Sequence, residues 1–327
     1  LEFDDAARHF SDAERMLRQM KNLEGLTELL LARAALRTQT QLQKQRDLDE
    51  ATALATQTGN LMHRLSSRFR QASLAVDAKD YEKAVSISRE VADEARRNGL
   101  QFLAVRALGD MGYSLLFARQ LERSVDILEE AIAYARQIKS YQMLAENQMR
   151  LGEALVMLER RDAALEQIRP AVEWYRNAQH RDVLPVNLIK YGTALGDQAG
   201  QSVPIYREAL EAARRAGNPF FEAMALQRLM RAAGPVNVRD AVSYANQLLP
   251  LARKVPHHRA MIQIAEHLRD FGRYSEARKV IQEAEAAIAR YPEGMDREFL
   301  QTRAEVFYAQ EALTLGNCEE GLALLRG

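Results

Sequence analysis

The residue types that most often perform chemistry are few in this chain of 327 residues, which has six histidines and one cysteine. No two histidines stand at i, i+4, the spacing with which one helix holds a zinc ion, and HExxH does not occur. His257 and His258 are adjacent, so on a helix they point to different sides, and they follow Pro256. We interpret them as a solvated helix start. The sequence therefore predicts no metal site.

Cys318 is the one candidate nucleophile. It follows Gly316 and Asn317, a pair typical of a turn. A nucleophilic cysteine needs a histidine base and an electropositive pocket, and nothing in the sequence places a histidine beside it. The acidic residues mostly stand near arginines at helical spacing, as on a solvated helix face. We therefore expect no catalytic residue, no cofactor and no enzymatic activity in this segment.

Charge and composition restrict the class of partner. The 45 Lys and Arg residues balance 45 Asp and Glu residues, whereas a nucleic-acid surface needs a basic excess. Purely apolar runs are a few residues long, far below the ~20 residues that span a bilayer. One cysteine excludes an intrachain disulfide and is typical of a reducing compartment. These features predict a cytoplasmic protein that binds neither nucleic acid nor a membrane.

The chain repeats itself, and the repeat organises every other feature. Gly112, Gly152 and Gly192 recur at a constant period of about 40 residues, which is in the range of repeat architectures. Twelve residues after Gly112 and after Gly152, a small residue begins a pattern of small, large and small side chains. The large residue follows four positions later, and the second small residue three positions after that. Ser124, Leu128 and Ala131 form one example. The pattern occurs eight times, in degraded form three times, with first members at 6, 44, 84, 124, 164, 202, 241 and 277.

Each repeat contains two helical segments. Residues 121–138 place apolar side chains at steps of 4, 3, 4 and 3, and residues 142–160 follow the same period. The segments are separated by short breakers such as Asn98-Gly99, so neighbouring helices must run antiparallel. A glycine inside a helix costs about 1 kcal/mol relative to alanine, so the recurring glycines predict a close helix crossing. The sequence predicts an all-α fold of helix pairs.

Residues 148–171 resemble a tetratricopeptide repeat: they contain Leu151-Gly152, Leu155, Ala164, Ile168 and Ala171 at the family's positions. The resemblance implies a right-handed α-solenoid of antiparallel helix pairs, with about seven full repeats and a partial repeat at each end. It covers residues 1–327 as a single domain. The period near 40 rather than 34 is similar to the extended repeats of bacterial signalling proteins and implies longer helices.

Both ends fall within a repeat. Residues 4–21 look like a second helix without its first, and residues 318–327 begin another second helix. We therefore expect the chain to be a fragment of a larger multidomain protein. In the resembling family, such arrays occur beside kinase or protease domains.

Candidate binding residues follow from the constant repeat period of 40 residues. Residues 40 positions apart should lie side by side on equivalent helices of neighbouring repeats, and we call such a set a column. One column is Arg70, Asp110, Arg150 and Lys190, and the others include Tyr113 with Glu153 and Phe69 with Met149. Along one helix, i, i+4, i+7 and i+11 put Arg106, Asp110, Tyr113 and Phe117 on one face. The resemblance implies that such first-helix positions line a concave groove. The candidates are Arg70, Arg106, Asp110, Tyr113, Phe117, Met149, Arg150, Glu153 and Lys190.

Two interpretations of these columns remain open. The simpler one, which we favour, is ion pairing between repeats along Arg70, Asp110 and Arg150. The other is a peptide site, because arginine and tyrosine dominate binding hot spots. The Lys and Asn set with which the family binds chaperone tails is not matched.

The resulting functional hypothesis is a non-catalytic scaffold that binds a protein or peptide, or another domain of the same protein, in a regulatory segment of a bacterial signalling protein. The alternative is a small-molecule sensor with a closed pocket near Tyr113, Arg150 and Glu153.

Overall fold

The computed structural model describes residues 2–36, 39–178, 180–196, 199–254, 258–289 and 295–326. Within these residues there are 17 α-helices and no strand, so the predicted all-α class is confirmed. The contacts divide the chain into unit 1, Leu1–Trp174, and unit 2, Tyr175–Gly327. Each unit is described by itself below. The predicted single domain over 1–327 remains a prediction.

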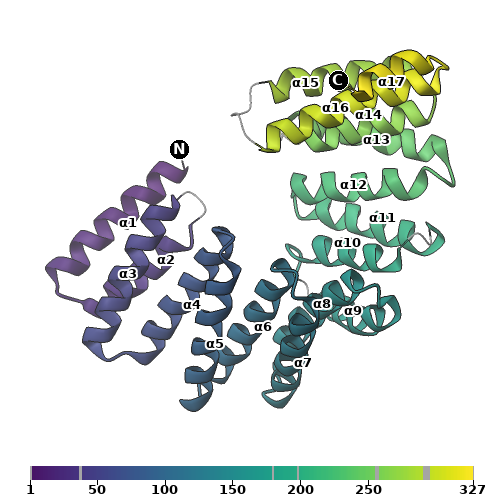
Figure 1. Ribbon diagram of the computed structural model, residues 1–327. Coiled ribbons are helices and arrows are strands. Elements are labelled where there is room, and N and C mark those ends of the chain that lie inside the picture. Colours follow the sequence, from purple (N-terminus) through teal and green to yellow (C-terminus); the bar gives the residue numbers. More distant parts are fainter. Residues whose placement is uncertain are drawn as a thin grey trace. The chain divides into compact units, whose positions relative to one another are not determined.

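Unit 1 is a stack of helices in which each packs against the next along the chain (Figure 1). Alternate helices α2, α4, α6 and α8 also pack against one another. We call these the first helices of the repeats, and α3, α5 and α7 the second helices. The bounds are α1 (Glu2–Gln19), α2 (Leu23–Ala34), α3 (Gln41–Thr58), α4 (Leu61–Asp77), α5 (Tyr81–Arg97), α6 (Gln101–Phe117), α7 (Leu121–Gln137), α8 (Tyr141–Met157) and, for its greater part, α9 (Arg161–Asn177).

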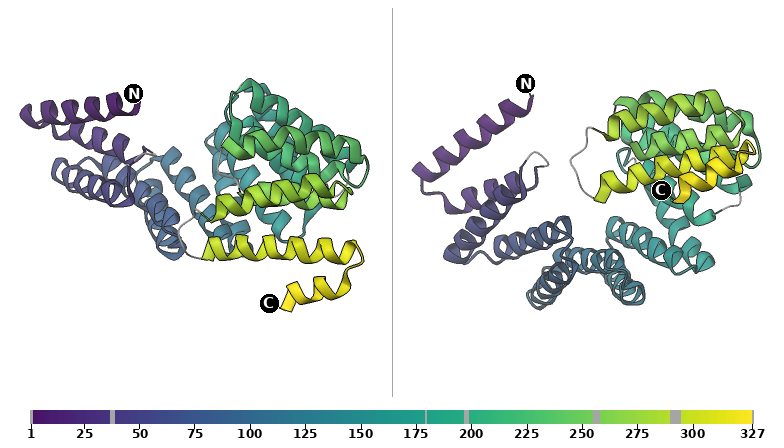
Figure 2. Two further views of the ribbon diagram at one scale, coloured as in Figure 1. Left: turned by 90° about the horizontal axis from the view of Figure 1, so that it is seen from above. Right: turned by 45° about the horizontal axis from the view of Figure 1, so that its top comes forward.

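Unit 2 continues the alternation with less regular helices, seen from two further directions in Figure 2. Prolines lie inside α11 and α13, at Pro204 and Pro250, as Pro170 does inside α9 in unit 1. His257 lies outside the described residues, and α14 begins at His258. The bounds are α10 (Leu184–Leu195), α11 (Ala199–Arg215), α12 (Pro219–Ala233), α13 (Val238–Lys254), α14 (His258–Asp270), α15 (Tyr274–Ile288), α16 (Met295–Thr314) and α17 (Cys318–Arg326).

The pairs agree with the predicted repeats. From α2/α3 to α14/α15 there are seven pairs, preceded by α1 and followed by α16 with the short α17. No helix in the described part of the chain is both long enough and apolar enough to cross a membrane.

The constant period comes from helix and turn lengths that hardly vary. The six helices α4 to α9 are each 17 residues long and are separated by short turns of equal length, such as 138–140. Positive φ angles occur at evenly spaced positions, residues 59, 79, 99, 119, 139 and 159. At Lys139 (φ 56°) the next amide, of Ser140, donates to the Ala135 carbonyl at 3.0 Å, which closes the helix end. Each of these helices with its turn takes 20 residues, so two successive helices make one repeat of 40 residues.

The recurring glycines lie at the predicted helix crossings. Each faces the large residue of the small, large and small pattern on the following helix. A Cβ on Gly112 would lie 2.6 Å from Leu128 Cγ, and one on Gly152 would lie 2.7 Å from Ile168 Cδ1. Gly192 is opposed in the same way by Tyr206. Because each glycine has no side chain, it leaves the space that the large side chain of the following helix occupies.

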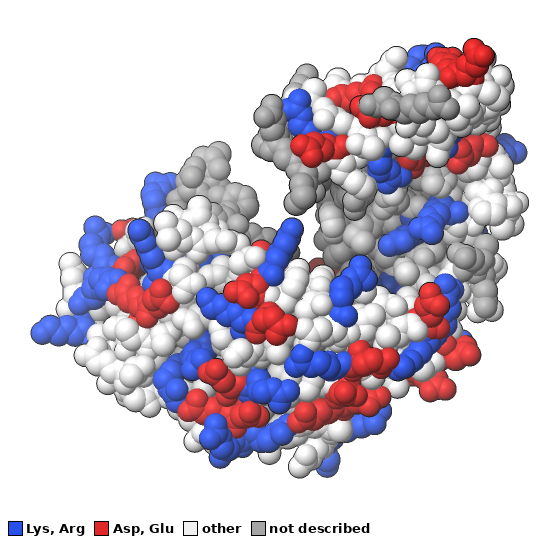
Figure 3. All heavy atoms as spheres, in the orientation of Figure 1, with Lys and Arg blue, Asp and Glu red and all other residues white. Residues whose placement is uncertain are grey.

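Ion pairs join successive second helices on the surface. Arg96 of α5 pairs with Glu130 of α7 at 2.6 Å, and within unit 2 Arg253 of α13 pairs with Glu283 of α15 at 2.9 Å. Figure 3 shows Lys and Arg side by side with Asp and Glu over the region of α5 and α7. Such exposed pairs contribute about 0–1 kcal/mol each. Some of the charges of this layer are therefore paired between successive repeats.

Replacement of Gly152 by leucine should lower the melting temperature clearly, because overpacking a helix crossing costs about 1–3 kcal/mol. The matched control is Gly200→Leu: Gly200 also lies in a helix, but no atom is within 4 Å of a Cβ placed there. The control should melt at or above the wild-type temperature. Equal melting of all three proteins would show that Gly152 is not at a crossing.

Replacement of Lys139 by glycine should stabilise unit 1. A residue with a side chain in the left-handed conformation costs about 1–2 kcal/mol, part of which glycine loses again through chain entropy, so we expect a net gain below ~1 kcal/mol. The thermal midpoint measures it, with Lys139→Ala as the control that keeps the Cβ. A gain of the same size for alanine would assign the effect to the lost lysine charge.

Candidate functional site

The candidate site is the outward face of α6 in unit 1, together with the side chains that α4, α5 and α8 place beside it. The predicted line of Arg106, Asp110, Tyr113 and Phe117 lies on α6. Arg106 and Phe117 are exposed, whereas Asp110 and Tyr113 are half-buried. Phe102, one turn before Arg106, is 61% exposed and extends the line. We call these five residues the α6 face.

The centre of the face is an ion pair between repeats. Arg150 Nη2 of α8 lies 2.8 Å from Asp110 Oδ1 and 2.8 Å from Glu146 Oε1. Its guanidinium carbon lies 5.2 Å from the centroid of the Tyr113 ring. Desolvation lowers the pKa of Arg150, but the two carboxylates outweigh it, and the pKa is raised above its ordinary value. The predicted pairing of Asp110 with Arg150 is present.

A glycine makes room for this arrangement. A Cβ on Gly109 would clash with Asn147 Oδ1 and would lie 2.8 Å from Arg150 Nη1. Asn147 is buried, and its Nδ2 donates to the Met143 carbonyl at 2.9 Å. Its Oδ1 accepts no hydrogen bond from the described residues. The sequence gave no sign of this role for Gly109.

One end of the face is aromatic. The Tyr113 and Phe117 rings meet edge to face with centroids 4.8 Å apart. Tyr81, the first residue of α5, stacks on Phe117 at 6.0 Å. Offset and edge-to-face pairs of this kind hold rings in fixed positions. Phe117 keeps 43% of its surface exposed, so the cluster offers a rigid apolar contact.

Beside Arg106 and Asp110, the face borders a charged hollow of about 230 Å³ between α2, α3, α4 and α6. Arg70, Arg106 and Asp110 line it together with Lys44 and Asp77. The expected Arg70–Asp110 pair is not formed, because Asp110 pairs with Arg150 instead. Burial and the neighbouring charge of Arg106 lower the pKa of Arg70. The hollow thus brings together three of the predicted residues in an unpredicted arrangement.

Three further predicted residues lie outside α6. Met149 is 2% exposed, because it lies one position before Arg150 on α8 and is turned into the helix packing. Its inclusion was wrong for that reason. Glu153 is half-buried on α8, further along the helix. Lys190 lies on α10 in unit 2.

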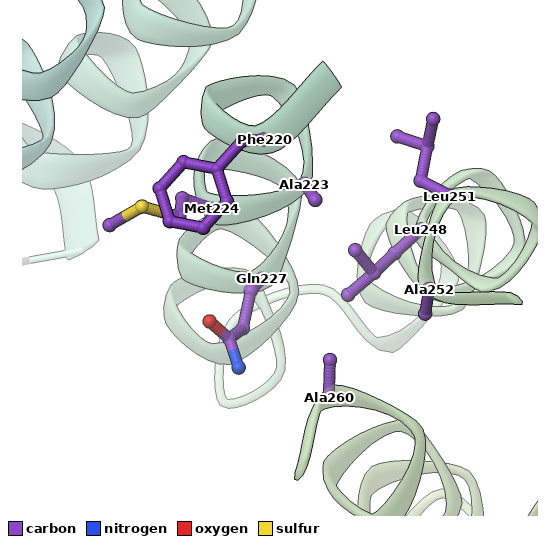
Figure 4. A pocket seen from close by; sticks show the side chains of 8 residues that line it. All are labelled: Phe220, Ala223, Met224, Gln227, Leu248, Leu251, Ala252 and Ala260. Atoms are coloured by element: carbon purple, nitrogen blue, oxygen red, sulfur yellow. The ribbon is translucent and has the colours of Figure 1, made fainter. Parts of the chain in front are cut away.

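Unit 2 contains an apolar cavity, shown in Figure 4. It lies between α12, α13 and α14, and its volume is about 10 Å³. Small-molecule sites are usually about 300–1,000 Å³, so this cavity is too small for a ligand of that kind. It is lined by Phe220, Ala223, Met224, Gln227, Leu248, Leu251, Ala252 and Ala260. Among the described residues, no group of three or more His, Cys, Asp or Glu side chains is arranged to hold a metal ion.

Comparisons with known proteins identify the fold. The sequence matches no established protein family, and no curated protein is significantly similar to it. Solved structures do resemble it. The apo form of RapI has a TM-score of 0.60 and 11% identity, over 81% of this chain and 99% of that chain. A signal-transduction ATPase with a tetratricopeptide repeat sensor, from Pyrococcus horikoshii, has a TM-score of 0.61 and 14% identity, over 93% of this chain and 46% of that chain.

A third structure contains a bound peptide. NprR in complex with its cognate peptide NprX has a TM-score of 0.54 and 12% identity, over 93% of this chain and 88% of that chain. At such low identity the likeness establishes the helical-repeat fold alone, and it confirms the fold that the sequence resemblance implied.

A double-mutant cycle of Asp110→Asn and Arg150→Gln should give a coupling free energy of about 1 kcal/mol, near the upper end for pairs in contact with water. Chemical unfolding of the four proteins measures it. The cycle of Arg96→Gln and Glu130→Gln is the control, and it should give a smaller coupling because both side chains are more exposed. Equal couplings would show that the burial of Arg150 adds nothing to the pair.

Proposed function

On the premise that this chain has the fold of tetratricopeptide-type repeat proteins, we propose that it is a non-catalytic scaffold that binds a peptide or protein segment on the α6 face. We further propose that it serves as a regulatory or sensor segment of a longer cytoplasmic signalling protein. Its partner is then a peptide, a separate protein or another domain of the same chain. Neither nucleic acid nor a membrane is a partner in this proposal.

The observation that carries the proposal is the side-chain composition of the α6 face. Exposed aromatic rings stand at both ends, Phe102 at 61% and Phe117 at 43% exposure. Between them, Arg150 is held over Tyr113 by two carboxylates. Large aromatic and arginine side chains whose positions are fixed before binding lose little entropy when a partner docks. On the second helices Arg96 lies over Tyr134 in a similar way, so what distinguishes the α6 face is its two exposed rings, Phe102 and Phe117.

The comparisons support the same proposal without identifying the partner. NprR was solved with its cognate peptide NprX, and a Rap protein was solved with competence and sporulation factor. The Rap structure has a TM-score of 0.57 to this chain, at 11% identity. A helical-repeat fold of this type can therefore hold a short peptide, which is the binding mode that we propose here.

The proposal is tested by selecting binders from a library of random short peptides displayed on phage, with the whole chain as bait. Peptides that bind the wild type should bind Phe102→Ala/Phe117→Ala at least thirtyfold more weakly, because loss of a hot-spot side chain costs about 2 kcal/mol or more. Affinities are measured by titration calorimetry. Phe102 is largely exposed, but Phe117 packs against Tyr113 and Tyr81, so the melting temperature should fall slightly, and the affinities are compared well below both melting temperatures.

Leu42→Ala is the control. Leu42 is exposed and apolar, but it lies on the second helix α3. It should leave the affinity unchanged. Normal binding by the α6 variant together with weak binding by Leu42→Ala would assign the function to the second-helix layer instead.

A further inference from the structure

Two arginines from neighbouring first helices, α4 and α6, line the charged hollow. In the described part of the chain, neither Arg70 nor Arg106 forms an ion pair or a side-chain hydrogen bond, although both line the same hollow. Arg106 lies over the Phe69 ring, with its guanidinium carbon 4.9 Å from the centroid. A half-buried guanidinium beside a second one is unfavourable unless an anion joins them. The two side chains therefore form a site that an incoming negative charge would complete.

The balance of charge around the hollow fixes the size of the missing charge. Lys44, Arg70 and Arg106 are cationic, while Asp77 and Asp110 are anionic. Asp77 lies 3.9 Å from Lys44, and Asp110 is committed to Arg150. Counted with Arg150 and its second partner Glu146, the group has four positive and three negative charges, so a single negative charge neutralises it. A dianionic phosphate would overcompensate and would lie near two aspartates.

We propose that the hollow is a carboxylate subsite, in which Arg70 and Arg106 together bind an aspartate or glutamate side chain of a peptide that lies on the α6 face. This inference rests on the proposed function and specifies it: the preferred partner is an acidic peptide. Guanidinium groups suit this role because each presents paired N–H donors that match the two carboxylate oxygens. A volume of about 230 Å³ accommodates such a side chain.

The position of the hollow also specifies the spacing within the peptide. Arg106 and Phe117 lie three helical turns apart on α6, which corresponds to about 16 Å along the helix. An extended peptide covers that distance in about five residues at ~3.3 Å per residue. The selected peptides should therefore carry an acidic residue about five positions from an aromatic or aliphatic residue.

A role in binding makes a different prediction from a role in folding. Arg70 is repelled by Arg106 and has no carboxylate partner among the described residues, so Arg70→Gln should leave the melting temperature unchanged or raise it. The same substitution should abolish the preference for acidic peptides. The matched control is Arg89→Gln, which removes an exposed arginine from the second helix α5. It should change neither property.

The direct probe is N-acetyl-aspartate methylamide, added to the full chain with the arginine side-chain Nε–H signals observed by NMR. The signals of Arg70 and Arg106, assigned from the two Gln variants, should shift on addition, and the asparagine analogue should leave them in place. The apparent affinity should fall at least tenfold in Arg70→Gln and should weaken with added salt. The phosphoserine analogue tests the other anion in the same way.

The peptide arm repeats the phage selection. Changing the acidic residue of a selected peptide to its amide should weaken binding by wild type at least tenfold and should not affect binding by Arg70→Gln/Arg106→Gln. Selected peptides without an acidic preference, whose binding still needs Phe102 and Phe117, would overturn the carboxylate subsite and leave the proposed function standing. Tighter binding of the phosphoserine analogue would overturn it as well. Shifts with the aspartate probe but no selected peptide would support the subsite and refute peptide binding.

Discussion

The constant step from one helix to the next is the constraint on which the candidate site depends. Helices of one length and turns of one length recur from α4 to α9 without insertion. Equivalent residues of successive repeats therefore occupy equivalent places on neighbouring first helices. That equivalence brings Asp110 and Arg150 within 2.8 Å, and it places Arg70 beside the same cluster. One extra residue within a helix would rotate the later residues of that helix by about 100° and would separate these side chains.

The two layers of unit 1 use their charges differently. Second helices are tied by pairs such as Arg96 with Glu130, in which each charge meets its opposite. On the first helices, a carboxylate that could have paired with Arg70 is taken by Arg150, and the aromatic rings at both ends stay exposed. The second helices thus pair some of their surface charges between repeats, whereas Arg70 of the first helix α4 has no carboxylate partner among the described residues.

The sequence was sufficient for the fold and for part of the site. The evenly spaced glycines predicted helix crossings, because a helix interior tolerates glycine only where a neighbour needs the space. The turns were harder to find: residues such as Lys79, Arg119 and Lys139 adopt positive φ and give no glycine signal. Met149 was misplaced because residues adjacent on a helix differ by about 100° in direction, and the column rule cannot tell which of the two faces outward.

The choice of ion-pair partner was also beyond the sequence. Arg70 and Arg150 are equally far from Asp110 along the chain, and side-chain geometry decides between them. Phe102 and Tyr81 were missed because they stand at helix starts, where the equivalent positions in neighbouring repeats are not aromatic. Similar residues at equivalent positions of successive repeats are a good sign that these positions pack between helices. A site that must recognise one particular partner instead breaks the column, so its residues are the ones that periodicity detects least.

The uniform turns have a consequence for how such an array can change over time. Between α4 and α9, the turn that joins a first helix to a second helix has the same length as the turn that joins one pair to the next, and its left-handed residue stands at the same place. The backbone therefore does not distinguish the two layers, and only the side chains do. Duplication or loss of one whole repeat by recombination would keep each layer intact and would lengthen or shorten the array. Gain or loss of half a repeat, that is, of one helix with its turn, would also fit the backbone. It would, however, move every following first helix into the layer of the second helices, and every following second helix into the layer of the first helices.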